Sequence, residues 1–122
     1  MKVELFSFGF KHGYPEADMV WDVRFLPNPY WIPELRNHTG LEEPVIIYVL
    51  ENTTGRRFLD QCTPFLLFFL RSHERAGRHE IRLAVGCTGG RHRSVAIIGQ
   101  LQKILADTEF DLNVFHRDIT KD

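Results

Sequence analysis

IRLAVGCTGGRHRS, from Ile81 to Ser94, is the segment from which the fold of this chain is most directly predicted. Its first five residues, Ile81 to Val85, are apolar except for Arg82 and predict a short strand. A glycine-rich turn from Gly86 to Arg93 follows, and Ser94 can cap the helix that begins after it. That helix carries apolar residues at helical spacing, namely Ile97, Ile98, Leu101, Ile104 and Leu105. Strand, turn and helix in this order form the repeating unit of an α/β domain.

Segments on both sides of this unit extend the pattern. Met1 to Phe8 is rich in Val and Phe and predicts a strand, Met19 to Phe25 predicts a second, and Asp111 to His116 predicts a last one. Three prolines predict an extended, stiff loop from Leu26 to Leu35.

The middle of the chain predicts helices less clearly. The β-branched composition of Val45 to Leu50 favours a strand, whereas Pro44 after two glutamates resembles a first helical turn. The apolar run from Phe65 to Leu70 predicts a buried helix that begins near Pro64, or is kinked there. Gly77 should stop this helix just after Ala76.

Alternating strands and helices predict a single α/β domain over residues 1–122, with a mostly parallel central sheet and helices on both faces. The chain has 122 residues, of which 43% are hydrophobic and 25% charged, so disordered and collagen-like classes are excluded. Its net charge of −1 excludes the overall positive charge that is typical of nucleic-acid-binding proteins, so any such binding must come from a local patch.

Cys62 and Cys87 cannot build a disulfide framework, and no Cys/His spacing suits zinc, so we expect neither a metal site nor a cofactor. The N-terminus lacks the apolar region of a signal peptide, and no apolar run approaches the ~20 residues of a membrane span. We therefore expect a cytoplasmic protein with no membrane contact.

The glycine-rich turn predicts an anion-binding site. Gly89 and Gly90 let backbone amides approach a ligand, and the following helix presents unpaired amides and a positive dipole end. Arg93 can hold an oxyanion with two parallel hydrogen bonds, while its neighbours add hydroxyl groups and positive potential. The expected phosphate-binding residues are Cys87, Thr88, Gly89, Gly90, Arg91, His92, Arg93 and Ser94. The alternative is a plain tight turn between strand and helix.

The same turn fits a cysteine-dependent phosphatase, in which a Cys, five residues and an Arg-Ser pair surround the phosphate. Cys87 would be the nucleophile and Arg93 would hold the phosphoryl oxygens. Gly86 stands where those enzymes usually carry a histidine, however, and Asp18 and Asp22 are only generic candidates for the leaving-group acid.

A second cluster, Phe8 to Gly13, follows the first predicted strand. If that strand is parallel to the one beginning at Ile81, their carboxyl ends share one edge of the sheet, where ligands bind in such folds. Lys11 and His12 would then face the glycine-rich turn. The alternative for His12 is an exposed turn residue.

Arg24 ends the second predicted strand and is a further candidate ligand-binding residue. A salt bridge to Asp22 or Glu34 is the alternative role for its side chain.

A local basic bias lies between Arg71 and Arg93, where six arginines face two glutamates and give a charge of +4. Such a patch can contact RNA phosphates, although a solvated helix end is the simpler explanation. No P-loop or dinucleotide-binding glycine motif occurs.

Four motifs resemble the C-terminal domain of the bacterial RNase adapter protein RapZ family. They are SFGFKHGYP (Ser7 to Pro15), DVRFLPNPYW (Asp22 to Trp31), the Thr39-Gly40-Leu41 turn and GCTGGRHRSV (Gly86 to Val95). The resemblance runs in order from about Leu5 to Arg117.

The resemblance implies a domain, similar to part of a sugar-phosphate kinase fold, that senses glucosamine-6-phosphate without turning it over. It also implies small-RNA binding, self-association and contact with an endoribonuclease. The implied sugar-phosphate pocket uses His12, Thr88, Gly89, His92 and Arg93. The resemblance further favours a helix over Val45 to Leu50.

Two departures from the family narrow these expectations. The family's P-loop domain has no counterpart in these residues, so no nucleotide hydrolysis is implied. Its basic tail is replaced by the charge-balanced Arg117 to Asp122, which weakens the expected RNA contact. The first hypothesis is a non-catalytic module that binds an amino-sugar phosphate. The alternatives are a cysteine phosphatase and a small-RNA-binding or RNase adaptor protein. The sequence itself does not determine whether the chain forms an oligomer.

Overall fold

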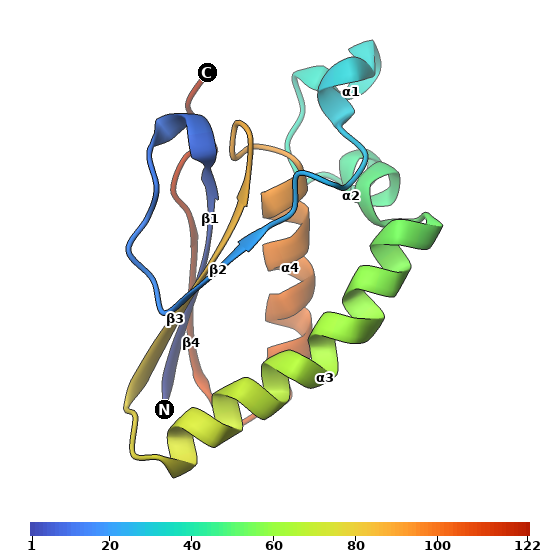
Figure 1. The fold of residues 1–122 in the computed structure, drawn as a ribbon. Coiled ribbons are helices and arrows are strands. Elements are labelled where there is room, and N and C mark those ends of the chain that lie inside the picture. Colours follow the sequence, from blue (N-terminus) through green and yellow to red (C-terminus); the bar gives the residue numbers. More distant parts are fainter.

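The computed structural model describes all of residues 1–122 and shows one parallel sheet with helices packed against it (Figure 1). The strands are β1 (Lys2–Gly9), β2 (Met19–Asp22), β3 (Glu80–Cys87) and β4 (Asp111–His116). They lie in the order β2-β3-β1-β4, and every neighbouring pair is parallel. The α/β class and the parallel sheet are thereby confirmed.

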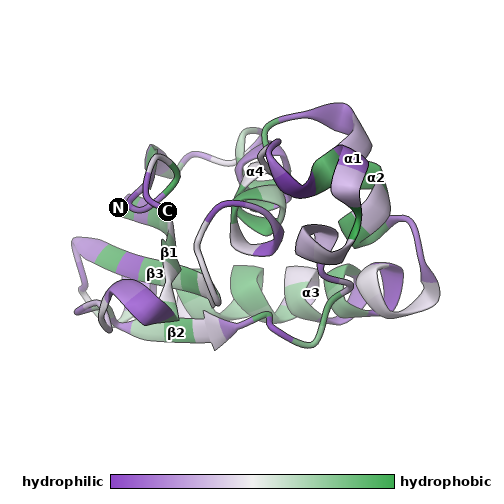
Figure 2. Cartoon of the chain, turned by 90° about the horizontal axis from the view of Figure 1, so that it is seen from above, coloured by the Kyte–Doolittle hydropathy of each residue, from purple (hydrophilic) through white to green (hydrophobic).

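The helices are α1 (Pro33–Arg36), α2 (Glu43–Leu50), α3 (Thr53–Arg75) and α4 (Arg93–Leu105), with short 3₁₀ turns η1 (Phe10–His12) and η2 (Pro29–Trp31). Viewed from above, α2, α3 and α4 all lie to one side of the strands (Figure 2). The structure thus differs from the expected arrangement with helices on both faces. The segment after β1 covers part of the opposite face instead, where Phe10 and Ala17 pack on Phe6, Phe8 and Ala84. The rest of that face is mixed: Glu4 and Arg82 form an ion pair on it, and the exposed Phe115 stacks on Phe6 with ring centroids 4.8 Å apart.

The main core lies between the sheet and α4. Alternate strand residues such as Val3, Leu5 and Leu83 point toward the helices and are fully buried. The apolar stripe predicted for α4 meets them, with Ile97, Ile98, Leu101 and Leu105 buried and Ile104 only half-buried. This stripe fixes how α4 crosses β1 and β3, and therefore where its first turn lies.

Helix α3 ends as predicted but begins much earlier than Pro64. The Asn52 side chain caps it by accepting a hydrogen bond from the Gly55 N–H at 2.8 Å, and Pro64 lies inside the helix. Its apolar run is not wholly buried, since Phe65 and Phe68 are exposed. None of the helices combines the length and apolar composition that crossing a bilayer requires.

Three other boundaries differ from the sequence predictions. Val45 to Leu50 is helical within α2, so the strand alternative is wrong. Strand β2 ends at Asp22 rather than at Phe25. The segment from Leu26 to Leu35 is not extended, because Pro29 and Pro33 each occupy the first turn of a short helix.

Candidate functional site

The carboxyl ends of β1 and β3 lie side by side, as the parallel arrangement predicted. Gly9 is paired in register with Cys87, and the Lys11 N–H donates to the Thr88 carbonyl at 3.2 Å. A Cβ atom on Gly9 would overlap the Gly89 backbone, and Gly90 has a φ of +78° that other residues rarely adopt. The loop from Thr88 to His92 therefore packs directly on the end of β1.

A cavity of about 700 Å³ opens beside this loop. Seven predicted residues line it: Lys11, Cys87, Thr88, Gly89, Arg91, His92 and Arg93. Six further lining residues were missed, and these are Asn28, Tyr30, Trp31, Arg36, Asn37 and Asp122. Most of the missed residues belong to the segment around η2 and α1, whose only sequence signal was the polar and aromatic cluster NPYW.

Arg93 is the most informative residue of the cavity wall. Only 5% of it is exposed, and its guanidinium donates to the carbonyls of Arg24 at 2.6 Å and Leu26 at 3.4 Å. Its Nη2 lies 3.4 Å from the Thr88 hydroxyl, and its buried Nε has no partner. No carboxylate lies within salt-bridge distance of Arg93. A buried cation without a counter-charge favours an anionic ligand.

The backbone beside Arg93 also has donors without a partner. The amides from Gly89 to Arg93 donate no hydrogen bond within the chain. Helix α4 begins after His92 without a side-chain cap, which leaves its positive dipole end open. The prediction that Ser94 caps this helix is wrong, because its hydroxyl lies 3.1 Å from the Cys87 sulfur instead.

His92 links the two walls of the cavity. Its Nε2 lies 3.1 Å from the Arg36 carbonyl oxygen, and the residue is almost fully buried. Burial, reinforced by the nearby charges of Arg91 and Arg93, lowers the pKa of His92 below its ordinary value. The imidazole is therefore neutral at pH 7, and it acts as a hydrogen-bond donor to Arg36 rather than as the positive charge expected from the sequence.

Three more cations at the cavity also have no carboxylate partner. Arg91 donates to the Ile119 carbonyl at 3.2 Å, and Arg36 donates to the Tyr30 carbonyl at 2.7 Å. Lys11 makes no ion pair. With Arg93, they give the cavity four cationic side chains against one carboxylate side chain, that of Asp122.

Four predicted site residues do not line the cavity. Gly90, within the loop, and Ser94, in the first turn of α4, are both buried. His12 is half-buried with an unpartnered Nε2, but it is not part of the cavity wall. Arg24 forms the alternative salt bridge to Asp22, at 2.7 Å, and its guanidinium lies 4.2 Å from the centre of the Phe10 ring.

The residues of the phosphatase motif are close together, but the environment differs from that of a working phosphatase. Cys87 is 2% exposed and accepts a hydrogen bond from the Ser94 N–H at 3.5 Å. A side chain at Gly86 would overlap the Phe8 ring, so the usual histidine has no room there.

Neither candidate acid suits proton donation. Asp18 accepts hydrogen bonds from the Arg82 N–H and the Arg78 side chain, which lower its pKa, and it lies beside Arg82, five residues before Cys87 on β3. The hydrogen bonds from Arg24 lower the pKa of Asp22. Both carboxyl groups are therefore ionised at neutral pH.

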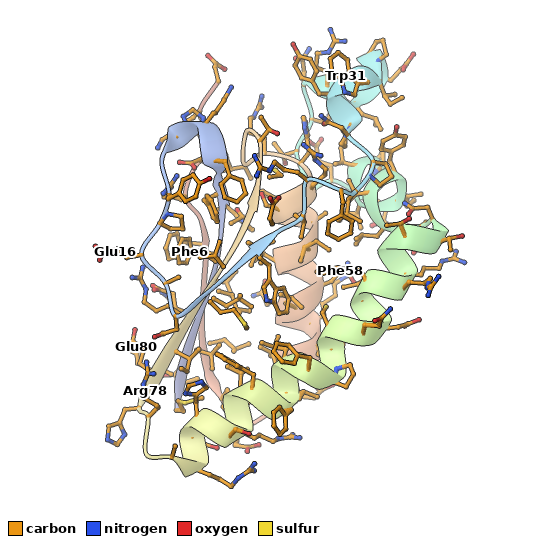
Figure 3. All side chains as sticks on the ribbon, in the orientation of Figure 1. Phe6, Glu16, Trp31, Phe58, Arg78 and Glu80 are labelled. Carbon is orange, nitrogen blue, oxygen red and sulfur yellow. The ribbon has the colours of Figure 1, made fainter.

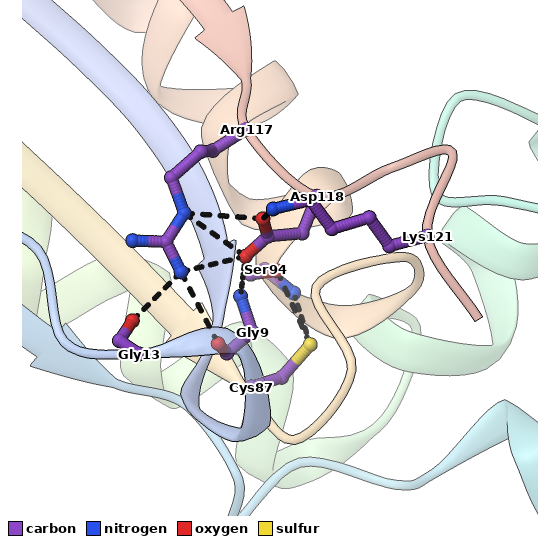
Figure 4. A network of polar contacts seen from close by, with 7 residues as sticks. All are labelled: Gly9, Gly13, Cys87, Ser94, Arg117, Asp118 and Lys121. Carbon is purple, nitrogen blue, oxygen red and sulfur yellow. Dashed lines mark hydrogen bonds and ion pairs between the residues drawn. The ribbon is translucent and has the colours of Figure 1, made fainter.

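A buried carboxylate that the sequence did not reveal, that of Asp118, binds the end of β1 next to the glycine-rich loop (Figure 4). Asp118 is fully buried and accepts hydrogen bonds from the Gly9 N–H and from Lys121, each at 2.7 Å, and from Arg117 at 2.8 Å. Burial would raise the pKa of Asp118, but these hydrogen bonds outweigh it and lower the pKa to about 2. The network ties the C-terminal segment to the end of β1, directly under Gly90.

The six arginines between Arg71 and Arg93 do not form one patch. Arg78 pairs with Asp18 at 2.9 Å and Arg82 pairs with Glu4, whereas Arg91 and Arg93 lie at the other end of β3. The local charge of +4 is therefore divided between two ends of the sheet.

A basic cavity thus lies at the carboxyl ends of parallel strands, beside a glycine-rich loop and a helix N-terminus, which is where α/β domains usually carry their ligand sites. The family model of the RapZ C-terminal domain matches residues 1–120, and the chain belongs to this family.

Its relatives confirm the assignment along the whole chain. A protein of Thermobifida fusca called "Nucleotide-binding protein" is 47% identical over 123 residues, covering 100% of this chain and 42% of that relative. Proteins of the same name from Nitratidesulfovibrio vulgaris and Bacillus thuringiensis are each 46% identical, covering 96% and 98% of this chain and 40% and 41% of the relatives. The chain thus spans about two fifths of the length of these relatives.

Proposed function

We propose that this domain binds the phosphate group of a small phosphorylated metabolite and does not turn it over. The observation that carries the proposal is the buried Arg93 guanidinium, which faces the cavity without a carboxylate partner. Glucosamine-6-phosphate is the first candidate ligand, because the family resemblance that the motifs support points to an amino-sugar phosphate.

Each part of the site has a role in this proposal. The free amides of the cavity-lining residues Gly89, Arg91, His92 and Arg93, at the N-terminus of α4, bind the phosphate oxygens, as helix N-termini commonly do. Arg93 adds a charge-assisted hydrogen bond, which is stronger inside a partly dry cavity than in water. Lys11 and Arg91 supply positive charge at the rim.

The phosphorus NMR signal of glucosamine-6-phosphate with the purified protein tests this proposal. Binding without turnover shifts or broadens the signal, and no inorganic phosphate appears. Arg93→Ala should weaken binding about 30-fold or more, equivalent to about 2 kcal/mol. Arg57→Ala, on the exposed face of α3, is the matched control. Unchanged affinity in a folded Arg93→Ala variant would move the site elsewhere.

A second variant guards against misfolding, because Arg93 is buried. Thr88 is exposed on the loop, and its hydroxyl lies 3.4 Å from Arg93. Thr88→Ala should weaken phosphate binding several-fold while the melting temperature stays constant. Equal affinity in this variant as well would contradict the proposed loop site.

A cysteine phosphatase is the second candidate, favoured by the 3.1 Å contact between the Cys87 sulfur and the Ser94 hydroxyl. In that case inorganic phosphate accumulates in the same NMR experiment, and Cys87→Ser abolishes it. Burial raises the pKa of the Cys62 thiol to about 11, so Cys62→Ser serves as an inert control. Rapid alkylation of Cys87 near neutral pH would also support this candidate.

Roles in small-RNA binding, in contact with a ribonuclease and in self-association rest on the family resemblance. We propose them only as additions to metabolite binding. RNA binding through phosphates should weaken steeply with salt, and a gel-shift series from 50 to 200 mM salt measures this.

A further inference from the structure

The wall opposite the glycine-rich loop carries two large aromatic side chains. Trp31 is 70% exposed and Tyr30 is 49% exposed, and both line the cavity. Their rings meet edge to face with centroids 5.2 Å apart. Trp31 lies at the end of the molecule where the strands have their carboxyl ends (Figure 3). An exposed indole in a cavity wall offers a large apolar face for a ligand.

Of the two rings, Trp31 is the one with a free face. The Arg36 guanidinium lies 4.8 Å from the centre of the Tyr30 ring, and its Nε donates to the Tyr30 carbonyl at 2.7 Å. Tyr30 is therefore already covered by a cation. No such group lies over Trp31, whose only aromatic neighbour is Tyr30.

This wall is held in a fixed position relative to the glycine-rich loop. Pro29 begins η2 and Pro33 begins α1, so both restrict the backbone around Trp31. The His92 imidazole then joins the wall to the start of α4 through the Arg36 carbonyl, at 3.1 Å. A ligand anchored by phosphate at Arg93 thus meets an aromatic surface that is already in place.

We propose that Trp31 stacks against the sugar ring of the bound phosphate ester and is the residue that selects cyclic sugar phosphates over acyclic ones. The inference rests on the proposed phosphate site and adds the recognition of the rest of the ligand. One face of a pyranose ring is made of C–H groups and packs on an indole, while Asn28 and Asn37 in the same wall can hydrogen-bond ring hydroxyls.

Affinities of four ligands for the wild type and for Trp31→Ala test the inference. The ligands are inorganic phosphate, glycerol 3-phosphate, glucose-6-phosphate and glucosamine-6-phosphate, titrated by NMR. Trp31→Ala should weaken both sugar phosphates about five- to ten-fold and leave the two acyclic ligands unchanged. Trp31→Phe keeps a ring and should retain most of the affinity. Because Trp31 is largely exposed, both variants should keep the wild-type melting temperature.

Intrinsic fluorescence gives a second readout. The other tryptophan, Trp21, packs on Phe58 with ring centroids 5.9 Å apart and does not line this cavity. Trp21→Phe therefore leaves Trp31 as the only indole. The fluorescence change on adding glucosamine-6-phosphate should persist in Trp21→Phe and disappear in Trp31→Phe.

The outcomes separate this inference from the proposed function. If inorganic phosphate binds and depends on Arg93, but Trp31→Ala weakens all four ligands equally or none of them, the ring-stacking role is wrong and the phosphate site stands. A change of molar mass in light scattering on Trp31→Ala would make Trp31 an interface residue and overturn the inference. Adenosine 5′-monophosphate is titrated as a fifth ligand. If Trp31→Ala weakened the binding of this nucleotide alone, the ring that stacks on Trp31 would be a nucleobase, and the inference would also be wrong. If no phosphate ester binds the wild type, the proposed function itself fails.

Discussion

Two charged side chains are buried at the carboxyl end of the sheet, and only one of them has partners of opposite charge. Asp118 is fully buried and receives hydrogen bonds from two cationic side chains and one backbone amide. Arg93 is equally hidden but meets only carbonyl and hydroxyl oxygens. The first charge stabilises the fold, and the second is free to respond to an anion.

Replacing the buried carboxylate should cost stability. Asp118→Asn removes an anion whose pKa is lowered to about 2, which corresponds to about 2 kcal/mol of stabilisation at neutral pH. Urea unfolding at pH 7 measures this loss. Asp60→Asn, on the exposed side of α3, is the control and should change little.

The same group predicts an acid dependence with a defined sign. Because the folded-state pKa of Asp118 lies below its ordinary value of 3.8, its stabilisation is present above pH 4 and is lost as the pH falls from about 4 to about 2. The wild type should lose this increment over that range, and Asp118→Asn should not. Parallel pH profiles of the two proteins would argue against the ion network.

Among the elements, α4 and the loop before it set the position of the site. The apolar stripe of Ile97, Ile98, Leu101 and Leu105 holds α4 against the sheet, and Gly89 and Gly90 let the loop pack closely on the end of β1. Alanine substitutions at two glycines, Gly9 at the loop contact and Gly99 within α4, test the close packing of the loop on β1.

Gly9→Ala and Gly99→Ala should have opposite effects on stability. A Cβ on Gly9 overlaps the Gly89 backbone, so this variant should be destabilised by about 2 kcal/mol or more and lose phosphate binding. A Cβ on Gly99, within α4, meets nothing, so that variant should gain about 0.5–1 kcal/mol. Thermal unfolding with phosphate titration compares them, and a stable Gly9→Ala variant that binds normally would contradict the close packing.

The elements that the sequence predicts follow from local pattern, whereas those that it misses depend on tertiary packing. The strand, turn and helix around Ile81 to Ser94 follow from local pattern, and so does the position of the glycine-rich loop at the end of β3. The start of α3 was missed because Pro64 reads as a boundary, whereas the packing of Leu66 and Leu70 and the Asn52 cap outweigh the hydrogen bond that the proline removes.

The missing half of the cavity has a similar cause. The prolines around η2 and α1 were interpreted as signs of an extended loop, but a proline also fits the first turn of a helix. Arg36 reaches the site only through its tertiary contact with His92, for which no local pattern exists. Asp118 was missed for the same reason, because its burial depends on the contact with the Gly9 N–H, from the other end of the chain.

For the molecule as a whole, ligand binding should raise thermal stability. A ligand that binds only the folded state at about 100 times its Kd adds about 2.7 kcal/mol, which is about 10 °C for a domain of this size. Glucosamine-6-phosphate should produce this shift in the wild type and not in Arg93→Ala. An equal shift in both proteins would place the binding site away from Arg93.

The parallel direction of all four strands has a practical consequence for handling the protein. The two termini lie at opposite ends of the sheet (Figure 1). Met1 precedes the start of β1, whereas Asp122 lies in the cavity wall at the carboxyl ends of the strands. The eight residues of β1 span roughly 25 Å between the amino end and the carboxyl end of the sheet. An affinity tag or surface tether attached before Met1 should leave the ligand free to enter. The same tag attached after Asp122 would hang at the mouth of the site and compete with the ligand for its arginines if the tag is acidic.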